Sequence, residues 1–188
     1  MSIAVIDYGS GNLKSVSKAL ETAANNINAN SKIMVTSDPK IIKQSKKIVL
    51  PGQGSFGDCY TGIKKIPGLE EALNEFVLEN KKPILGICVG MQLFAKTGYE
   101  SHKTNGFGWI DAEVRKINNM NKKLKLPHMG WNEIELTKDS FLFSNIKNKS
   151  HVYFIHSYEF KTKKKDYVVA TTNYGNSIIV SVEKENIV

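Results

Sequence analysis

The sequence has little cysteine and almost no arginine. Cys59 and Cys88 are the only cysteines among 188 residues, which excludes a disulfide framework and a cysteine-rich zinc site. Arg115 is the only arginine, so the bidentate fork that reads phosphate or guanine is nearly missing despite a net charge of +8. The charge comes from lysines in short clusters, a pattern typical of a solvated surface. We expect no metal, no cofactor and no nucleic-acid partner.

Long apolar runs are also missing. A membrane-spanning helix needs about 20 consecutive apolar residues, and no stretch of this sequence approaches that length. Two cysteines without a disulfide pattern fit a reducing compartment. The sequence therefore predicts a protein of the cytoplasm with no membrane partner. A chain of 188 residues is long enough for one domain and too short for two, so residues 1–188 are expected to form a single domain.

One stretch, residues 82–94, places a cysteine where the hydrophobic pattern changes. Residues 84–87 form an apolar run that predicts a buried strand, and Gly90 opens a segment with apolar residues at helical spacing. The residues with that spacing are Met91, Phe94 and Ala95. Cys88 is thus expected at a sharp turn between a strand and a helix.

The spacing Gly86-x-Cys88-x-Gly90 has the form of a nucleophile elbow with cysteine in place of serine. The N–H groups and positive dipole end of the following helix would favour a thiolate at this turn. Cys88 is therefore our candidate nucleophile. On this motif alone a second interpretation stays open, a buried free cysteine that packs as a small hydrophobe.

The first half of the chain alternates apolar strands with helices, a pattern that predicts an α/β fold with a parallel sheet covered on both faces. The predicted elements are strands at 3–6, 33–35 and 48–50 and helices at 39–44 and 69–80. In the second half, strands spaced by turns predict an antiparallel meander. They cover residues 110–117, 132–136, 152–157, 168–172 and 178–182. We expect a mixed sheet, parallel in its first half and antiparallel in its second.

Five motifs together carry a family resemblance, and they lie at residues 5–12, 50–58, 86–93, 127–132 and 153–158. Gly-x-Cys-x-Gly alone is similar to the class I glutamine amidotransferases. The opening Asp7-Tyr8-Gly9-x-Gly11-Asn12 and the block Pro127-His128-Met129-Gly130-Trp131-Asn132 narrow the match, because together the motifs resemble the glutaminase subunits of imidazole glycerol phosphate synthase. The resemblance implies the three-layer, flavodoxin-like α/β fold of class I amidotransferases.

The resemblance also implies a mechanism. The Cys88 thiolate would attack the side-chain amide of glutamine, release ammonia from a glutamyl thioester, and be regenerated by water. The oxyanion would be held by the N–H of Val89 and by an N–H of the strand Gly52-Gln53-Gly54, which in the family is thought to need reorientation. The remaining pocket residues implied by the resemblance are Gln92, Glu100, Ser157 and Tyr158.

The resemblance also implies a partner protein. The ammonia would pass to a cyclase subunit, in a heterodimer that makes imidazole glycerol phosphate and an aminoimidazole carboxamide ribotide for histidine biosynthesis. The family's docking face matches Asn12, Trp131, Asn132 and Tyr153. Without the resemblance, Trp131 would be assigned to the core, because tryptophans are mostly buried.

The resemblance fails at one point. The family takes its general base and orienting carboxylate from a His-Pro-Glu segment near the C-terminus, and no such segment occurs here. We assign the base role to none of the four histidines, and we expect the 188-residue form to hydrolyse glutamine negligibly. A sequence cut short explains this better than natural loss, since inactive relatives usually substitute catalytic residues and keep the fold.

Three alternatives stay open at this point. The chain could be an inactive docking subunit of a cyclase, or an amidotransferase paralogue that feeds another synthase, such as an amidino-sugar enzyme. A cysteine hydrolase unrelated to glutamine shares the elbow, but it does not account for Gln92 or for the glycines around Gln53.

Overall fold

In the computed structural model, which describes residues 2–118 and 124–188, strands and helices alternate through the first half of the chain. The strands are β1 (Ser2–Ile6), β2 (Lys32–Thr36), β3 (Lys47–Gly52) and β4 (Ile84–Cys88). The helices are α1 (Leu13–Asn26), α2 (Pro39–Gln44), α3 (Phe56–Lys65) and α4 (Leu69–Asn74), and α4 continues into a π-helical turn, η1 (Glu75–Glu79). The predicted elements of this half are confirmed.

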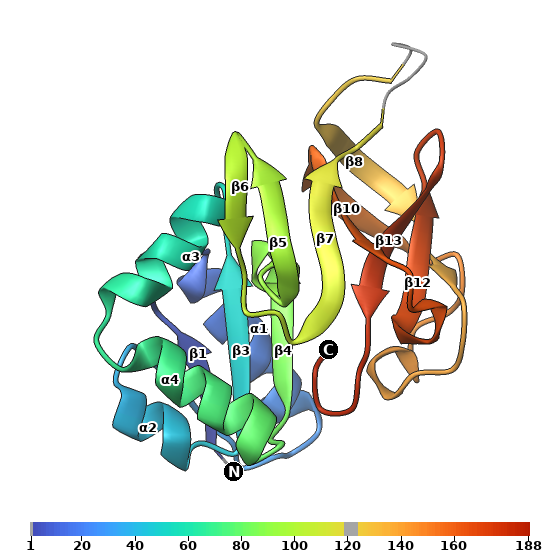
Figure 1. Ribbon diagram of the computed structural model, residues 1–188. Coiled ribbons are helices and arrows are strands. Elements are labelled where there is room, and N and C mark those ends of the chain that lie inside the picture. The colour runs from blue at the N-terminus through green and yellow to red at the C-terminus, as the bar shows by residue number, and fades with distance from the viewer. Residues whose placement is uncertain (1, 119–123) are drawn as a thin grey trace.

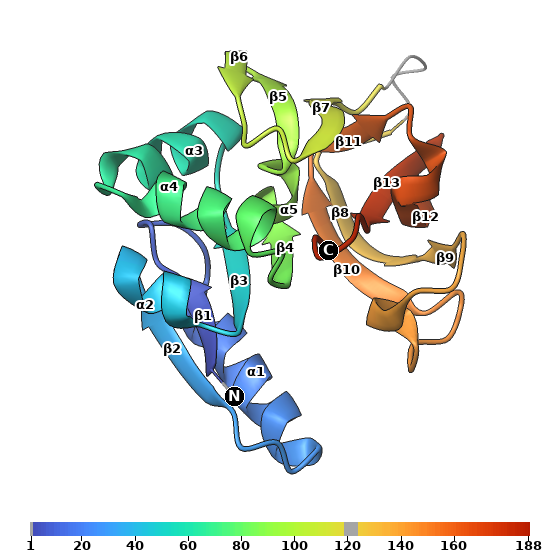
Figure 2. The same ribbon diagram turned by 60° about the horizontal axis from the view of Figure 1, so that its bottom comes forward.

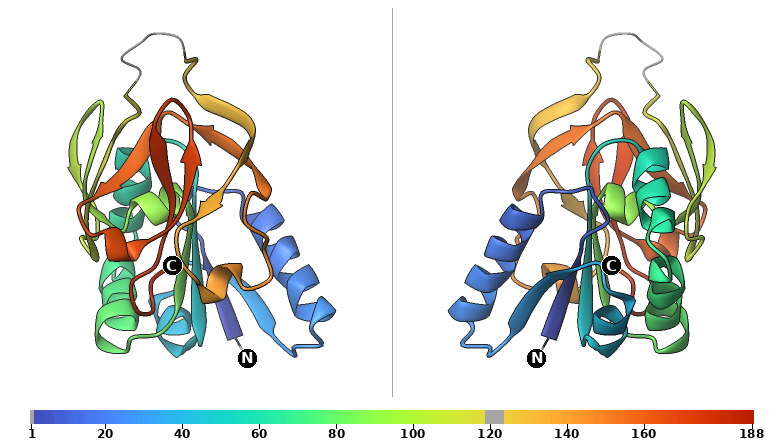
Figure 3. Two further views of the ribbon diagram at one scale, coloured as in Figure 1. Left: turned by 90° about the vertical axis from the view of Figure 1, so that its right-hand side faces the viewer. Right: turned by 90° about the vertical axis from the view of Figure 1, so that its left-hand side faces the viewer.

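These four strands form one parallel sheet in the order β2-β1-β3-β4. Helix α1 lies on one face of the sheet, and α3 and α4 lie on the other (Figure 3). Because both faces are covered, the central strands are apolar without alternation, and residues 4–6 and 48–50 are all buried. Gly52 of β3 pairs with Cys88 of β4, which puts the glycine-rich segment and the cysteine side by side at the carboxyl edge of the sheet.

The second half is built almost entirely of strands (Figure 1). They are β5 (Ala95–Glu100), β6 (His102–Asn105), β7 (Ile110–Lys116), β8 (His128–Glu133), β9 (Glu135–Leu136), β10 (His151–His156), β11 (Tyr158–Thr162), β12 (Val168–Asn173) and β13 (Ser177–Val182). Two 3-10 turns, η2 (Phe141–Phe143) and η3 (Lys165–Tyr167), interrupt them. Strands β5, β6 and β11 were not predicted, and the strand expected at 132–136 is divided between β8 and β9.

These strands form two further sheets. One has seven strands in the order β6-β5-β7-β11-β13-β12-β9, antiparallel except for the β5–β7 pair, and the other is the antiparallel ribbon β10-β8. The predicted parallel first half and antiparallel second half are confirmed. They occupy separate sheets of one α/β fold, because β4 pairs with β3 and with the C-terminal residues, while β5 begins the next sheet.

The helix expected after Cys88 is wrong in length. Helix α5 covers only Val89–Gln92, and Ala95 already begins β5. The N–H of Ile110 donates to the carbonyl of Phe94 at 3.0 Å, so sheet pairing replaces the next helical turn. Phe94 and Ala95 are fully buried. Their apolar spacing reflects burial in the core and not a helix face.

The two halves share one core, which contains Phe56, Phe76, Phe94 and Phe160. The last residues of the chain lie against β4 (Figure 2). Val188 donates its N–H to Ile84 at 3.0 Å and accepts from the N–H of Gly86 at 2.8 Å, so the chain runs parallel to the strand that carries Cys88. In the part of the chain that is described, no helix combines the length and apolarity needed to cross a membrane.

Candidate active site

Cys88 occupies a strained turn between β4 and α5. Its φ is +57°, a value that non-glycine residues adopt rarely and mainly at functional sites. Cβ atoms on the two flanking glycines would collide with the core: one on Gly86 would lie 2.5 Å from the ring of Phe94, and one on Gly90 would lie 1.8 Å from the carbonyl oxygen of Leu50. The predicted strand-to-helix turn is confirmed, and close packing explains why glycines flank it.

Replacing Gly90 with alanine is expected to destabilise the fold by about 3 kcal/mol or more, because β3 and α5 must move apart to admit the methyl group. Urea unfolding measures the change. Gly57→Ala in helix α3 is the matched control, since its Cβ would meet the nearest atom, Thr104 Oγ1 of β6, at an ordinary contact distance of 3.4 Å. Equal unfolding midpoints for the two variants would contradict the packing argument.

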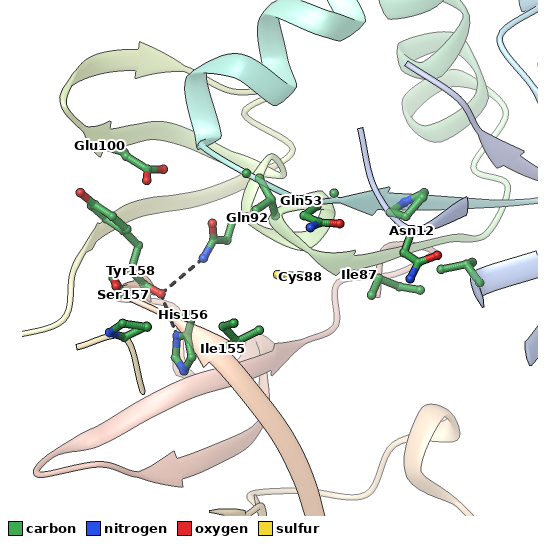
Figure 4. A pocket seen from close by; sticks show the side chains of 16 residues that line it. Asn12, Gln53, Ile87, Cys88, Gln92, Glu100, Ile155, His156, Ser157 and Tyr158 are labelled. Carbon is green, nitrogen blue, oxygen red and sulfur yellow. Dashed lines mark hydrogen bonds between the residues drawn. The ribbon is translucent and has the colours of Figure 1, made fainter. Parts of the chain in front are cut away.

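Cys88 opens into a cavity of about 580 Å³ between the carboxyl edge of the parallel sheet and strands β10 and β11. All nine residues predicted for catalysis and substrate binding line it: Cys88, Gly52, Gln53, Gly54, Val89, Gln92, Glu100, Ser157 and Tyr158. Glu100 and Tyr158 lie toward one end and Asn12 toward the other, with Cys88 between them (Figure 4). The structure thus brings together residues that are spread over more than a hundred positions of the chain.

The structure corrects the expected ionisation of the nucleophile. Surrounding protein atoms displace water from the sulfur, and this desolvation raises the pKa of the Cys88 thiol, although a hydrogen bond from the N–H of Val89 opposes the shift. Helix α5 is only four residues long, so its dipole is weak. The raised pKa favours the thiol over the thiolate, so a base that takes the thiol proton would assist its attack on a substrate.

The segment expected to supply an oxyanion N–H is tied down by side chains. Ser10 accepts from the N–H of Gln53 at 3.1 Å and donates to the carbonyl of Gln53 at 2.5 Å. The buried Cys59 donates to the same carbonyl at 3.4 Å, and Tyr8 donates to the carbonyl of Pro51 at 2.6 Å. The N–H of Gln53 is thus engaged by Ser10, and it must be released before it can face an oxyanion at Cys88.

Replacing Ser10 with alanine is expected to loosen this segment. Loss of the two hydrogen bonds that Ser10 makes with Gln53, about 1 kcal/mol each, should speed amide exchange of the Gln53 N–H by roughly five- to thirtyfold. Hydrogen exchange followed by NMR measures the change, and Ser15→Ala, at an exposed serine in α1, is the control. Unchanged exchange at Gln53 would show that Ser10 does not hold the strand.

The polar end of the cavity is built from three elements. Gln92 of α5 donates to the carbonyl of Tyr158 at 3.4 Å, and Glu100 of β5 accepts from the N–H of Phe56 at 2.8 Å, at the start of α3. A carboxylate and an amide at one end suit a ligand with an amino group and a carboxylate. Sequence reasoning missed Val16, Ile87, Pro127, Ile155 and His156 among the lining residues. Ile155 and His156 precede Ser157 within one of the quoted motifs, and this adjacency was the available signal.

One face of the β8–β10 ribbon is apolar and exposed, and one of its residues, Ile155, also lines the cavity. We call it the ribbon face, and it consists of Met129, Trp131, Tyr153 and Ile155, with exposed fractions of 56%, 71%, 54% and 58%. Trp131 and Tyr153 pair across the strands and meet edge to face at 5.7 Å. Exposure on this scale is typical of a protein interaction site.

The other two predicted docking residues are used within the fold. Asn12 caps helix α1 by accepting from the N–H of Ser15 at 3.2 Å, and it also lines the cavity. Asn132 is half-buried and contacts His128, so its side chain lies on the inner face of β8, opposite to Trp131.

A cysteine on a strained strand-to-helix turn, in a cavity at the edge of a parallel sheet, is the arrangement expected of a class-I glutamine amidotransferase, and comparison with known families decides between this class and other cysteine hydrolases. The family described as "Glutamine amidotransferase class-I" matches residues 4–188. A solved structure titled "Crystal structure of glutamine amidotransferase" has the same fold, with a TM-score of 0.70 at 17% identity over 98% of this chain and 86% of that one.

Curated relatives identify the family of this chain within the class. Imidazole glycerol phosphate synthase subunit HisH of Pelagibacter ubique is 54% identical over 188 residues, covering 100% of this chain and 88% of the relative. The subunit of the same name from Mesorhizobium japonicum is 41% identical over 191 residues, again covering 100% and 88%. The chain belongs to the HisH family of class-I glutamine amidotransferases.

Proposed function

We propose that this chain is the glutaminase subunit of an imidazole glycerol phosphate synthase. Such a subunit hydrolyses glutamine to glutamate and ammonia, and a cyclase subunit consumes the ammonia to form imidazole glycerol phosphate and an aminoimidazole carboxamide ribotide for histidine biosynthesis. Membership of the HisH family supports the assignment, and the observation that carries it is Cys88 on its strained turn inside the cavity. The proposal treats residues 1–188 as one amidotransferase domain.

The proposed chemistry follows from the positions around Cys88. The sulfur attacks the amide carbon of glutamine, the carbon–nitrogen bond breaks with release of ammonia, and water cleaves the resulting thioester. Val89 and the Gly52-Gln53-Gly54 segment stabilise the oxyanion once the N–H of Gln53 leaves Ser10. Gln92, Glu100, Ser157 and Tyr158 hold the amino-acid end of the substrate, supported by their places at the cavity wall.

The proposed partner is the cyclase subunit, bound on the ribbon face and beside Asn12, in a heterodimer. Asn12 lines the same cavity as Cys88, so a partner seated there closes one end of the cavity and receives the ammonia directly. Two free thiols, Cys59 and Cys88, support the cytoplasm as the compartment.

A binding experiment tests the proposal. Trp131→Ala is expected to weaken association with the cyclase subunit by 2–4 kcal/mol, about 30- to 1,000-fold, because tryptophans at the centre of an interface contribute most of its binding energy. Calorimetric titration measures the affinity. Phe141→Ala is the control, since Phe141 is 88% exposed but lies in η2, outside the ribbon face. If the unmodified chain does not bind the cyclase subunit, the proposed partner is wrong. Equal losses of affinity for both variants would show that the ribbon face is not the binding site.

A further inference from the structure

On the inner face of the β8–β10 ribbon, two histidines form a continuous hydrogen-bonded chain with the cavity wall. His128 Nδ1 and His156 Nε2 are 2.9 Å apart, and the two residues pair directly across the strands. His156 Nδ1 lies 2.9 Å from the carbonyl oxygen of Tyr158, and Asn132 Nδ2 lies 3.2 Å from His128 Nε2. The chain therefore runs from Asn132 through both rings to the carbonyl of Tyr158, which also accepts from Gln92.

The groups at the two ends of this chain fix where its protons lie. A carbonyl oxygen only accepts, so His156 Nδ1 carries a proton. Asn132 is oriented by two further bonds, because its Oδ1 accepts from the N–H of Glu133 at 2.9 Å and its Nδ2 donates to the carbonyl of Asn173 at 3.0 Å. The amide nitrogen therefore faces His128 and donates, so His128 Nε2 carries no proton.

The hydrogen bond between the two histidine rings can then have only one direction. His128 with a bare Nε2 must carry its proton on Nδ1, and this proton is donated to His156 Nε2. All three bonds point the same way, from Asn132 toward Tyr158, and both rings are neutral. A second proton on either ring would set two donors against each other and break one of the bonds.

The surroundings of His128 hold this arrangement in place. The ring is 3% exposed and stacks on Phe154 at 4.7 Å and on Tyr174 at 4.0 Å. Burial and the neighbouring His156 lower the pKa of His128, which favours the neutral ring. Phe154 belongs to the same ribbon, and its strand neighbours Tyr153 and Ile155 form the ribbon face on the opposite side.

We propose that His128 and His156 are positioning residues for glutamine: they fix the carbonyl of Tyr158, and through it the amide of Gln92, in register with the ribbon that carries the docking face. The inference rests on the proposed function for the identity of the substrate. In this proposal, His128 and His156 contribute to glutamine affinity and take no part in proton transfer at Cys88.

Histidine NMR on the full chain tests the arrangement without any substrate. Nitrogen-15 shifts at pH 7 are expected to show both rings neutral, with the proton on Nδ1 in each. In His156→Leu, the side-chain amide signal of Gln92 should shift, and in His151→Asn it should not, because His151 is exposed at the start of the same strand. A proton on Nε2, a cationic ring, or an unmoved Gln92 signal would overturn the proposal.

Glutamine affinity provides the second readout. His156→Leu should raise the dissociation constant for L-glutamine about three- to tenfold, the cost of one misplaced hydrogen-bonding group. His156→Asn should restore most of the affinity, since the asparagine amide nitrogen replaces Nδ1 as donor to Tyr158. Equal affinity in His156→Leu and the unmodified chain would also overturn the proposal. If the unmodified chain does not bind glutamine, the proposed function fails, and the NMR result still decides the arrangement of the pair.

Discussion

Cys88→Ser is expected to stop covalent capture of a glutamine-shaped electrophile, such as the chloroketone analogue of glutamine, with a fall in rate of about 1,000-fold or more. Cysteine is an intrinsically strong nucleophile even when only a small fraction is thiolate, whereas a serine hydroxyl needs strong activation. Cys88 is exposed at the cavity, so the electrophile reaches it directly. Intact-mass spectrometry over several hours measures the incorporation.

The second cysteine provides the control for this experiment. Cys59 is buried, and its sulfur donates to the carbonyl of Gln53, so it is shielded from the same reagent. Cys59→Ala should leave capture at Cys88 intact, and an excess of L-glutamine should slow it by occupying the cavity. Label on Cys59, or equal labelling of Cys88→Ser and the unmodified chain, would remove Cys88 from the nucleophile role.

The pH dependence of capture follows from the raised pKa of Cys88. Only the thiolate reacts, and well below the pKa its fraction rises about tenfold with each pH unit. Labelling should therefore accelerate about tenfold per unit between pH 6.5 and 8. If the labelling rate no longer rose with pH above pH 7, Cys88 would already be a thiolate at that pH, as a strong helix dipole would predict.

The sequence was sufficient to locate the cavity because its glycines carry packing information. The elbow glycines are needed where α5 crosses β3, so the spacing around Cys88 predicts the turn directly. The neighbouring motifs follow strand ends, and parallel strands bring their carboxyl ends to one edge. The family resemblance assigned Gln53 and Val89, distant in sequence, to one pocket, and the pairing of β3 with β4 explains why they meet there.

Other features depend on pairing and solvation, which the sequence does not display. Apolar spacing over Met91, Phe94 and Ala95 fits a helix or a buried strand equally well, and the bond from Ile110 to Phe94 decides for the strand. Desolvation of the sulfur raises the pKa of Cys88, which opposes the thiolate that the helix dipole alone would favour.

The histidine pair was hidden for a similar reason. His128 and His156 meet only because β8 and β10 pair in that register, and residues 28 positions apart give no sign of it in the sequence. Asn132 was assigned to the docking face from the motif around Trp131. Strand alternation places the two side chains on opposite faces, so the motif combines an exposed contact with an internal one.

The 188-residue chain is expected to release ammonia from glutamine about 1,000-fold or more slowly than the same chain joined after Val188 to a segment containing His-Pro-Glu, because no histidine of the described residues has a free ring nitrogen in the cavity to take the thiol proton. Among the described residues, His156 is the histidine that lines the cavity. Its Nδ1 donates to Tyr158, and its Nε2 accepts from His128, so it has no lone pair free for the sulfur.

The position of Val188 shows why a joined segment should reach the sulfur. Ile187 pairs in parallel with Ile84, so a continuing strand runs along β4 toward Cys88. A second cavity of about 370 Å³ adjoins Cys88 between β4, β10 and β13, and it gives such a strand room. A histidine entering from this side approaches the sulfur opposite to the Gly52-Gln53-Gly54 segment, leaving the proposed oxyanion position open.

Ammonia release in the presence of the cyclase subunit and glutamine decides the point, with a joined Ala-Pro-Ala segment as the matched control. Activity only with His-Pro-Glu would assign the base to the joined histidine and the nucleophile to Cys88. Equal activity in the unextended chain would require a base among its own residues. His156 would then have to give up its bond with His128, and loss of the Nδ1–H arrangement from its nitrogen-15 spectrum would show the change directly.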